Sequence, residues 1–156
     1  MFKPHILALK GPSNTGKTTI IKRVRSKILG YFGDQATETD FLSKRATSDI
    51  KRIIEIGEFK IGIESQGDPV GPSKGLGRLH DSLKYFVEQG CHLIVCTSRE
   101  SGKTAEYINV YESKYTIISY KKIKEPESKM ESMWNITATE IFNKVVSLYD
   151  DFKRVK

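Results

Sequence analysis

The stretch that decides the fold of this chain is GPSNTGKT, residues 11–18. It fits the pattern G-x-x-x-x-G-K-[S/T] at every fixed position. A short apolar run, ILAL at residues 6–9, precedes it, and an amphipathic run follows it as far as Gly30. The apolar positions of the second run share one helical face: Ile20, Ile21, Val24 and Ile28. We therefore predict a buried parallel strand, a glycine-rich turn and a helix that ends at Gly30.

The spacing within residues 11–18 suits the capture of a phosphate chain. Gly11 and Gly16 let the backbone curl, so that consecutive N–H groups face one anion. The following helix directs the positive end of its dipole at the same anion. Lys17 can then reach the β- and γ-phosphates of a nucleoside triphosphate, and the Thr18 hydroxyl can bind magnesium. The expected phosphate contacts come from Gly11, Ser13, Asn14, Thr15, Gly16, Lys17, Thr18 and Thr19.

Residues 6–19 resemble the Walker A region of P-loop NTPases, most of all the small kinase-like members, which carry this motif near the N-terminus. The likeness is specific over that segment and only architectural elsewhere. It implies ATP or another nucleoside triphosphate as ligand, Mg2+ as cofactor and Lys17 as a catalytic residue. It leaves the acceptor, the nucleobase preference and the oligomeric state open.

Strand-like and helix-like runs alternate along the rest of the chain. Two β-rich runs, residues 53–56 and 59–64, flank Gly57-Glu58 and predict an antiparallel hairpin. A capping box of Thr137 with Glu140 predicts the start of the last helix. Its buried face is expected to carry Ile141, Val145, Leu148 and Phe152. We also expect strands at residues 37–41, 92–96 and 116–120, and helices at residues 76–87 and 103–113.

This alternation predicts an α/β fold and a single domain that spans residues 1–156. Together with the resemblance, it implies a three-layer domain of the P-loop NTPase type. The central sheet is expected to be mixed but mostly parallel, with one β-hairpin.

A P-loop enzyme usually adds an acidic residue at the end of a neighbouring apolar strand, where it holds the magnesium shell. The best match is FKIGIE, residues 59–64, with Asp68 shortly after it. This run departs from the family's pattern, because Lys60 interrupts the apolar residues and the terminal acid is Glu rather than Asp. We favour Glu64 slightly over Asp68 as the metal-shell acid, and a plain turn at residues 67–69 is the structural alternative.

The loop at residues 97–104, TSRESGKT, follows a predicted core strand. Arg99 and Lys103 could clamp the γ-phosphate or an anionic substrate there, as lid arginines do in small kinases. The alternative is a solvated loop charge or a salt bridge. For the general base that an acceptor hydroxyl requires, Asp40 is the first candidate and Asp34 the second, whereas a surface or capping role is the alternative.

The bulk composition is compatible with a nucleotide or nucleic-acid partner. The net charge is +7 over 156 residues, which favours a polyanionic partner, although ordinary surface lysines account for it equally well. No apolar run approaches the roughly 20 residues that cross a bilayer, so no membrane partner is expected. Cys91 and Cys96 form neither a zinc pattern nor a disulfide framework, which favours reduced thiols in the cytoplasm.

These features favour a small kinase that transfers the γ-phosphoryl group of ATP to a nucleoside, nucleotide or polynucleotide. Two alternatives stay open: an ATPase whose hydrolysis acts on a nucleic-acid or protein partner, and a nucleotide-binding module without significant turnover. GTP is disfavoured because the sequence contains no N-K-x-D motif.

Overall fold

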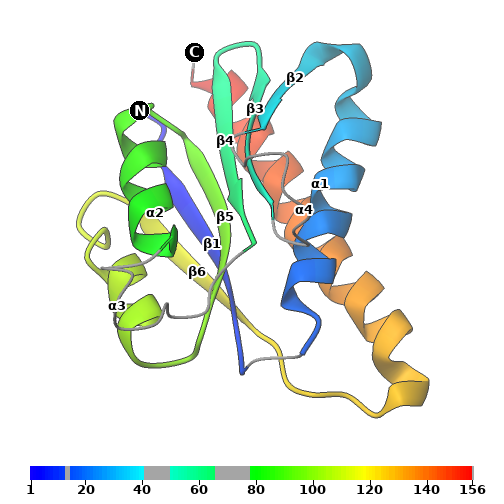
Figure 1. Ribbon diagram of the computed structural model, residues 1–156. Coiled ribbons are helices and arrows are strands. Elements are labelled where there is room, and N and C mark those ends of the chain that lie inside the picture. Colours follow the sequence, from blue (N-terminus) through cyan, green and yellow to red (C-terminus); the bar gives the residue numbers. More distant parts are fainter. Residues whose placement is uncertain (13–14, 41–49, 66–77, 156) are drawn as a thin grey trace.

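The computed structural model describes residues 1–12, 15–40, 50–65 and 78–155, and in them a six-stranded sheet has the order β2-β3-β4-β5-β1-β6 (Figure 1). Strands β4, β5, β1 and β6 run parallel, whereas β2, β3 and β4 form an antiparallel meander. The sheet is therefore mixed and mostly parallel. Its strands are β1 (His5–Lys10), β2 (Ala36–Asp40), β3 (Lys51–Ile56), β4 (Phe59–Glu64), β5 (Leu93–Ser98) and β6 (Thr116–Lys121).

Helices cover both faces of this sheet (Figure 1). One face packs against α1 (Lys17–Phe32) and α4 (Met130–Arg154), and the other against α2 (Arg78–Glu88) and α3 (Lys103–Asn109). Side chains of β1 alternate between these two cores, with Leu7 and Leu9 on the α1–α4 side and Ile6 and Ala8 on the α2–α3 side. The predicted α/β architecture with layered helices is confirmed.

Strand β1 lies inside the sheet, between β5 and β6, and both of these neighbours are parallel to it. All four residues of the apolar run 6–9 have no exposed surface, as a strand covered on both faces requires. The carboxyl ends of β1, β4, β5 and β6 consequently meet at one edge of the sheet. Residues 11–18 begin at this edge.

The hairpin prediction is confirmed, because β3 and β4 pair antiparallel and Ile56 lies opposite Phe59 across the two-residue turn. The expected strands at residues 92–96 and 116–120 correspond to β5 and β6, and the expected strand at residues 37–41 corresponds to β2. Phe41 of that prediction lies outside the described residues, as does Leu76 of the predicted second helix.

Three predicted helix boundaries are wrong. Helix α1 passes Gly30 and ends at Phe32, which is buried against Tyr149 of α4 at a ring distance of 4.8 Å. Helix α3 ends at Asn109 rather than near residue 113. Helix α4 begins at Met130, so Thr137 lies in its interior and caps nothing. The packing of Phe32 extends α1 past Gly30, because the burial of a ring outweighs a glycine cost of about 1 kcal/mol. The added first turns of α4 are bonded to Arg23 of α1 through Glu131 and Asn135.

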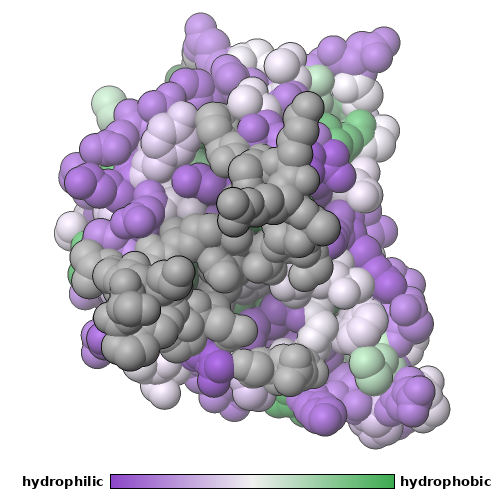
Figure 2. All heavy atoms as spheres, in the orientation of Figure 1, coloured by the Kyte–Doolittle hydropathy of each residue, from purple (hydrophilic) through white to green (hydrophobic). Residues whose placement is uncertain are grey.

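The coloured part of the face drawn in Figure 2 is mostly polar. On the face drawn in Figure 2, hydrophilic side chains dominate among the coloured residues and hydrophobic ones are scattered. Exposed apolar side chains in the described residues include Ile123 and Ile136. Within those residues, no helix combines the length and the apolar character of a membrane span.

An aromatic cluster packs at the end of the sheet opposite residues 11–18. The ring of His92, just before β5, stacks on Phe59 at 5.7 Å and lies 4.5 Å from the ring of Phe152. The Lys60 N–H donates to His92 Nδ1 over 3.2 Å, and a protonated ring could not accept this bond. Burial, and after it the charge of Lys60, lowers the pKa of His92.

This lowered pKa predicts a loss of stability in acid. The unfolded chain takes up a proton at His92 near the ordinary pKa of about 6.5, whereas the folded chain takes it up only at lower pH. Stability should therefore fall as the pH decreases through about 6.5 and below. Urea unfolding of the wild type and His92→Asn, which keeps an acceptor but does not titrate, checks this. Parallel pH profiles for the two proteins would contradict the assignment.

Candidate functional site

The chain leaves the sheet at Gly11, where the backbone is held from both sides. The Gly11 N–H donates to the carbonyl of Ser98 on β5 over 3.1 Å. On the other side, the Lys122 N–H donates to the carbonyl of Lys10 over 2.7 Å. A Cβ added at Gly11 would overlap the carbonyl oxygen of Lys122, so only glycine fits between these neighbours.

Lys17 joins the first turn of α1 to the start of this segment. Its Nζ donates to the carbonyl oxygens of Gly11 over 2.6 Å and of Pro12 over 2.8 Å, and the residue is 8% exposed. The Thr15 hydroxyl also donates to the Pro12 carbonyl, over 2.9 Å. Backbone oxygens thus hold a largely desolvated ammonium group inside the turn. They accept its hydrogen bonds but, being uncharged, leave its positive charge unneutralised.

Helix α1 begins directly after this turn. Gly16 is its N-cap, in the left-handed conformation with φ 87° and ψ 13°, and no side chain of the described residues caps the helix. The first turn contains no acidic residue. The amide groups and the positive dipole end of a 16-residue helix therefore lie beside the turn in which the Lys17 ammonium is held.

Trp134 on α4 covers Gly16 from the outside. A Cβ at Gly16 would overlap Cε2 and Nε1 of the Trp134 ring. Arg23 of α1 lies over the same ring, with its guanidinium carbon 5.6 Å from the ring centroid. The sequence analysis missed Trp134 because one tryptophan in a polar stretch belongs to no motif.

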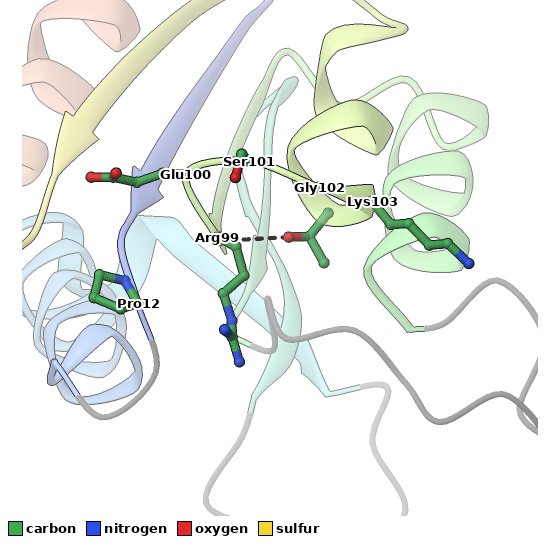
Figure 3. Close-up of a pocket in the computed structure, with 7 residues that line it drawn as sticks. Pro12, Arg99, Glu100, Ser101, Gly102 and Lys103 are labelled. Carbon is green, nitrogen blue, oxygen red and sulfur yellow. Dashed lines mark hydrogen bonds between the residues drawn. The ribbon is translucent and has the colours of Figure 1, made fainter.

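The loop between β5 and α3 forms a pocket of about 360 Å³ with Pro12. The Arg99 N–H donates to the Thr104 hydroxyl over 3.0 Å and so ties this loop to the first turn of α3. In Figure 3 the Arg99 guanidinium lies between Pro12 and Lys103, and the Lys103 ammonium points away from Arg99. The structure thus brings Arg99 and the start of residues 11–18 to the same pocket.

Glu64 ends β4 and has no exposed surface. The Ser82 hydroxyl of α2 donates to its Oε2 over 2.5 Å. Strand β5 lies between β4 and β1, so the backbone of Glu64 is about 10 Å from β1 and level with Ala8. Cys96, opposite Glu64, belongs to the α2–α3 core, so the Glu64 carboxylate lies on that side of the sheet.

The strands directly beside β1 are β5 and β6, and β5 separates β1 from β4. Strand β5 ends in the buried residues Thr97 and Ser98, which the sequence analysis placed in the loop at residues 97–104. No group of three or more His, Cys, Asp or Glu residues that could hold a metal ion occurs in the described part of the chain. Ser13, Asn14 and Asp68, which were predicted for the phosphate and magnesium sites, lie outside the described residues.

Asp40 lies at the end of the edge strand β2, four strands from β1, a separation of roughly 19 Å. Its carboxylate pairs with Arg52 Nη2 over 3.2 Å. Arg52 also contacts Glu38, which Arg25 of α1 grips through Nε and Nη2 over 2.5 and 2.6 Å. Hydrogen bonding from Arg25 lowers the pKa of Glu38. The structure thus places Asp40 in an ion-pair group and does not bring it to residues 11–18.

The structure also gives the positions of the remaining residues that the sequence analysis singled out. Asp34, the second candidate for the base, is exposed in a 3₁₀ turn beyond the far end of α1. That end is about 24 Å from the N-terminus of the helix. Thr18 and Thr19 lie in the first turn of α1. Cys91 and Cys96 are free and buried, and burial raises the pKa of each thiol to about 12, so both are inert at neutral pH.

No family model, curated protein or solved structure matches this chain. The structure defines an α/β protein with a six-stranded, mostly parallel sheet and helices on both faces in its described part. Any assignment of function therefore depends on the residues of the site and on their geometry.

Gly16, the N-cap of α1, and Gly30, inside α1, provide a paired test of the turn. Gly16→Ala forces a side chain into a left-handed backbone and against Trp134, so it should lower the free energy of unfolding by about 1–3 kcal/mol. Gly30→Ala is the matched control. A Cβ at Gly30 meets no atom within 4 Å inside the same helix, and the change should stabilise the protein by about 0.5–1 kcal/mol. Urea unfolding measures both, and equal effects would contradict this account of the turn.

Proposed function

We propose that residues 11–18 bind the triphosphate of ATP, or of another nucleoside triphosphate, together with magnesium. The observation that carries this proposal is the buried Lys17 ammonium, held over the Gly11 and Pro12 carbonyls at the start of α1. A fixed cation beside the N-terminus of a long helix favours the binding of a polyphosphate. The G-x-x-x-x-G-K-[S/T] pattern supports the same ligand.

Thr18 is the residue that suits magnesium, because it follows Lys17 in the first turn of α1. Magnesium keeps several waters and takes only one or two protein ligands beside the phosphates. The protein therefore needs no preformed cluster of acids. Glu64 and Asp68 stay the two candidates for the acid of the magnesium shell, and Glu64, which is bonded to Ser82, would act through water.

For the reaction we propose transfer of the γ-phosphoryl group to a nucleoside, nucleotide or polynucleotide acceptor. The pocket between Pro12 and the β5–α3 loop supports this, since it offers room beside the phosphate-binding segment and presents Arg99. Arg99 would neutralise charge that develops on the transferred group. The net charge of +7 favours an anionic acceptor. The need for ATP and magnesium favours the cytoplasm as the location of the protein.

Asp40 stays a prediction for the general base, and in this structure its carboxylate is paired with Arg52.

The position of Glu64 favours a second candidate function. Its carboxylate lies two strands from β1 and is bonded to Ser82, which suits a module that binds nucleoside triphosphate with little turnover. An ATPase that acts on a nucleic-acid or protein partner is the third possibility, favoured by the net charge.

Loss of the Lys17 ammonium should weaken binding of ATP with magnesium by about 10- to 100-fold, the worth of a charged hydrogen bond to phosphate. Equilibrium dialysis with labelled ATP on Lys17→Ala measures this. Lys27→Ala removes the same charge from the same helix, away from the turn, and should bind like the wild type. Circular dichroism confirms that both variants are folded. Wild-type affinity in folded Lys17→Ala would refute the proposed site.

The reaction is tested with ATP labelled at the γ-phosphate and a panel of nucleosides, nucleotides and oligonucleotides. A kinase labels an acceptor, an ATPase releases only phosphate, and a binding module does neither. If an acceptor is labelled, Arg99→Ala should lower kcat by about 100-fold or more and spare ATP binding, because the arginine acts on developing charge. Lys114→Ala is the control, since Lys114 is an exposed lysine that does not line this pocket. Equal loss in both variants would contradict the role of Arg99.

A further inference from the structure

The first turns of α4 lie against the proposed phosphate-binding segment. Trp134, one turn into α4, packs its indole edge on Gly16, the left-handed residue at which the turn becomes helix α1. The residue is half-buried. This is a tertiary contact between residues 118 positions apart, and it falls on the only glycine of the segment whose φ is positive in the described residues.

Arg23 holds the tryptophan in this position. Its guanidinium lies over the Trp134 ring at 5.6 Å. The same group donates to Glu131 Oε2 over 2.7 Å and to Asn135 Oδ1 over 2.8 Å. Both partners are on α4, on either side of Trp134 in the sequence. Arg23, two turns along α1 from Gly16, thus fixes the start of α4 to α1. It lies over the face of the indole ring, whereas the edge of the ring contacts Gly16.

This arrangement bears on anion binding because a glycine-rich turn has many backbone conformations in solution. Ordering such a turn around a phosphate costs about 1–2 kcal/mol of backbone entropy per residue fixed. A ring packed against Gly16 reduces the number of backbone conformations of the free turn. Binding of an anion then loses less backbone entropy. No contact between Trp134 and the phosphates is needed for this effect.

We propose that Trp134 is a positioning residue, which holds the Gly16 turn in its phosphate-binding conformation and couples the start of α4 to occupancy of the site. The inference rests on the proposed function, since it concerns the same site. Coupling of this kind is reciprocal: if docked Trp134 strengthens phosphate binding, bound phosphate strengthens the docking of Trp134.

The chain contains one tryptophan, so tryptophan emission reports on the surroundings of Trp134, which include Gly16. Titration of the wild-type protein with ATP and magnesium should change the Trp134 emission saturably. The midpoint should equal the dissociation constant from equilibrium dialysis. Tripolyphosphate with magnesium should change the emission in the same direction, because the contact is to the phosphate turn rather than to a nucleobase.

Three variants separate positioning from general stability. Trp134→Ala should weaken ATP binding about tenfold, within the usual range of a coupling between sites, whereas Trp134→Phe, which keeps a ring against Gly16, should restore most of the affinity. Phe142→Ala is the matched control. It removes a half-buried ring from the same helix, where Phe142 contacts Tyr31 at the far end of α1. It should lower the melting temperature and leave the affinity unchanged.

The outcomes distinguish this inference from the function on which it rests. Absence of ATP binding to the wild type in dialysis overturns the proposed function and the inference together. Binding by the wild type with unchanged Trp134 emission at saturation overturns the inference alone. The same holds if Trp134→Ala binds as tightly as the wild type, or if Phe142→Ala loses as much affinity as Trp134→Ala.

Discussion

The whole site depends on the hydrogen bonding of β1 to a parallel strand on each side. Backbone bonds continue to the last residue of β1, with Lys122 donating to Lys10 on one side and Gly11 donating to Ser98 on the other. The turn that follows therefore starts from a rigid position at the carboxyl edge of the sheet, which is where α/β proteins place their ligands. A strand at the edge of the sheet would hold the turn from one side only.

The turn itself is built from three physical requirements that meet within a few residues. Close approach to Lys122 requires a glycine at position 11, and the left-handed backbone requires another at position 16. The Lys17 ammonium then joins the two ends of the turn through backbone carbonyls. The left-handed backbone at Gly16 and the bonds of Lys17 are local, whereas the approach of Lys122 to Gly11 is a tertiary contact. Together they leave a buried positive charge at the start of a helix.

Charged side chains at the antiparallel edge of the sheet form ion pairs with one another. Glu38, Asp40, Arg25 and Arg52 satisfy one another between α1 and the antiparallel edge of the sheet, so their charges stabilise that corner of the fold. Arg99 and Lys103, in contrast, lie around the pocket that includes Pro12. Charges of the same sign therefore have different surroundings at the two places in the fold, which the net charge alone does not reveal.

The amino-acid sequence by itself determined the local elements: the buried strand at residues 6–9, the hairpin around Gly57-Glu58, the buried face of the last helix and the glycine-rich turn with Lys17. Each depends on the nature of neighbouring residues, through hydrophobic periodicity or backbone freedom. Tertiary structure alone decided that β5 rather than β4 lies beside β1, that Glu64 is bonded to Ser82, that Asp40 is engaged with Arg52, and that α4 begins at Met130 so that Trp134 covers Gly16. These features arise from contacts between residues far apart in the chain, whose free energy depends on how whole strands and helices pack and is absent from any short window of sequence.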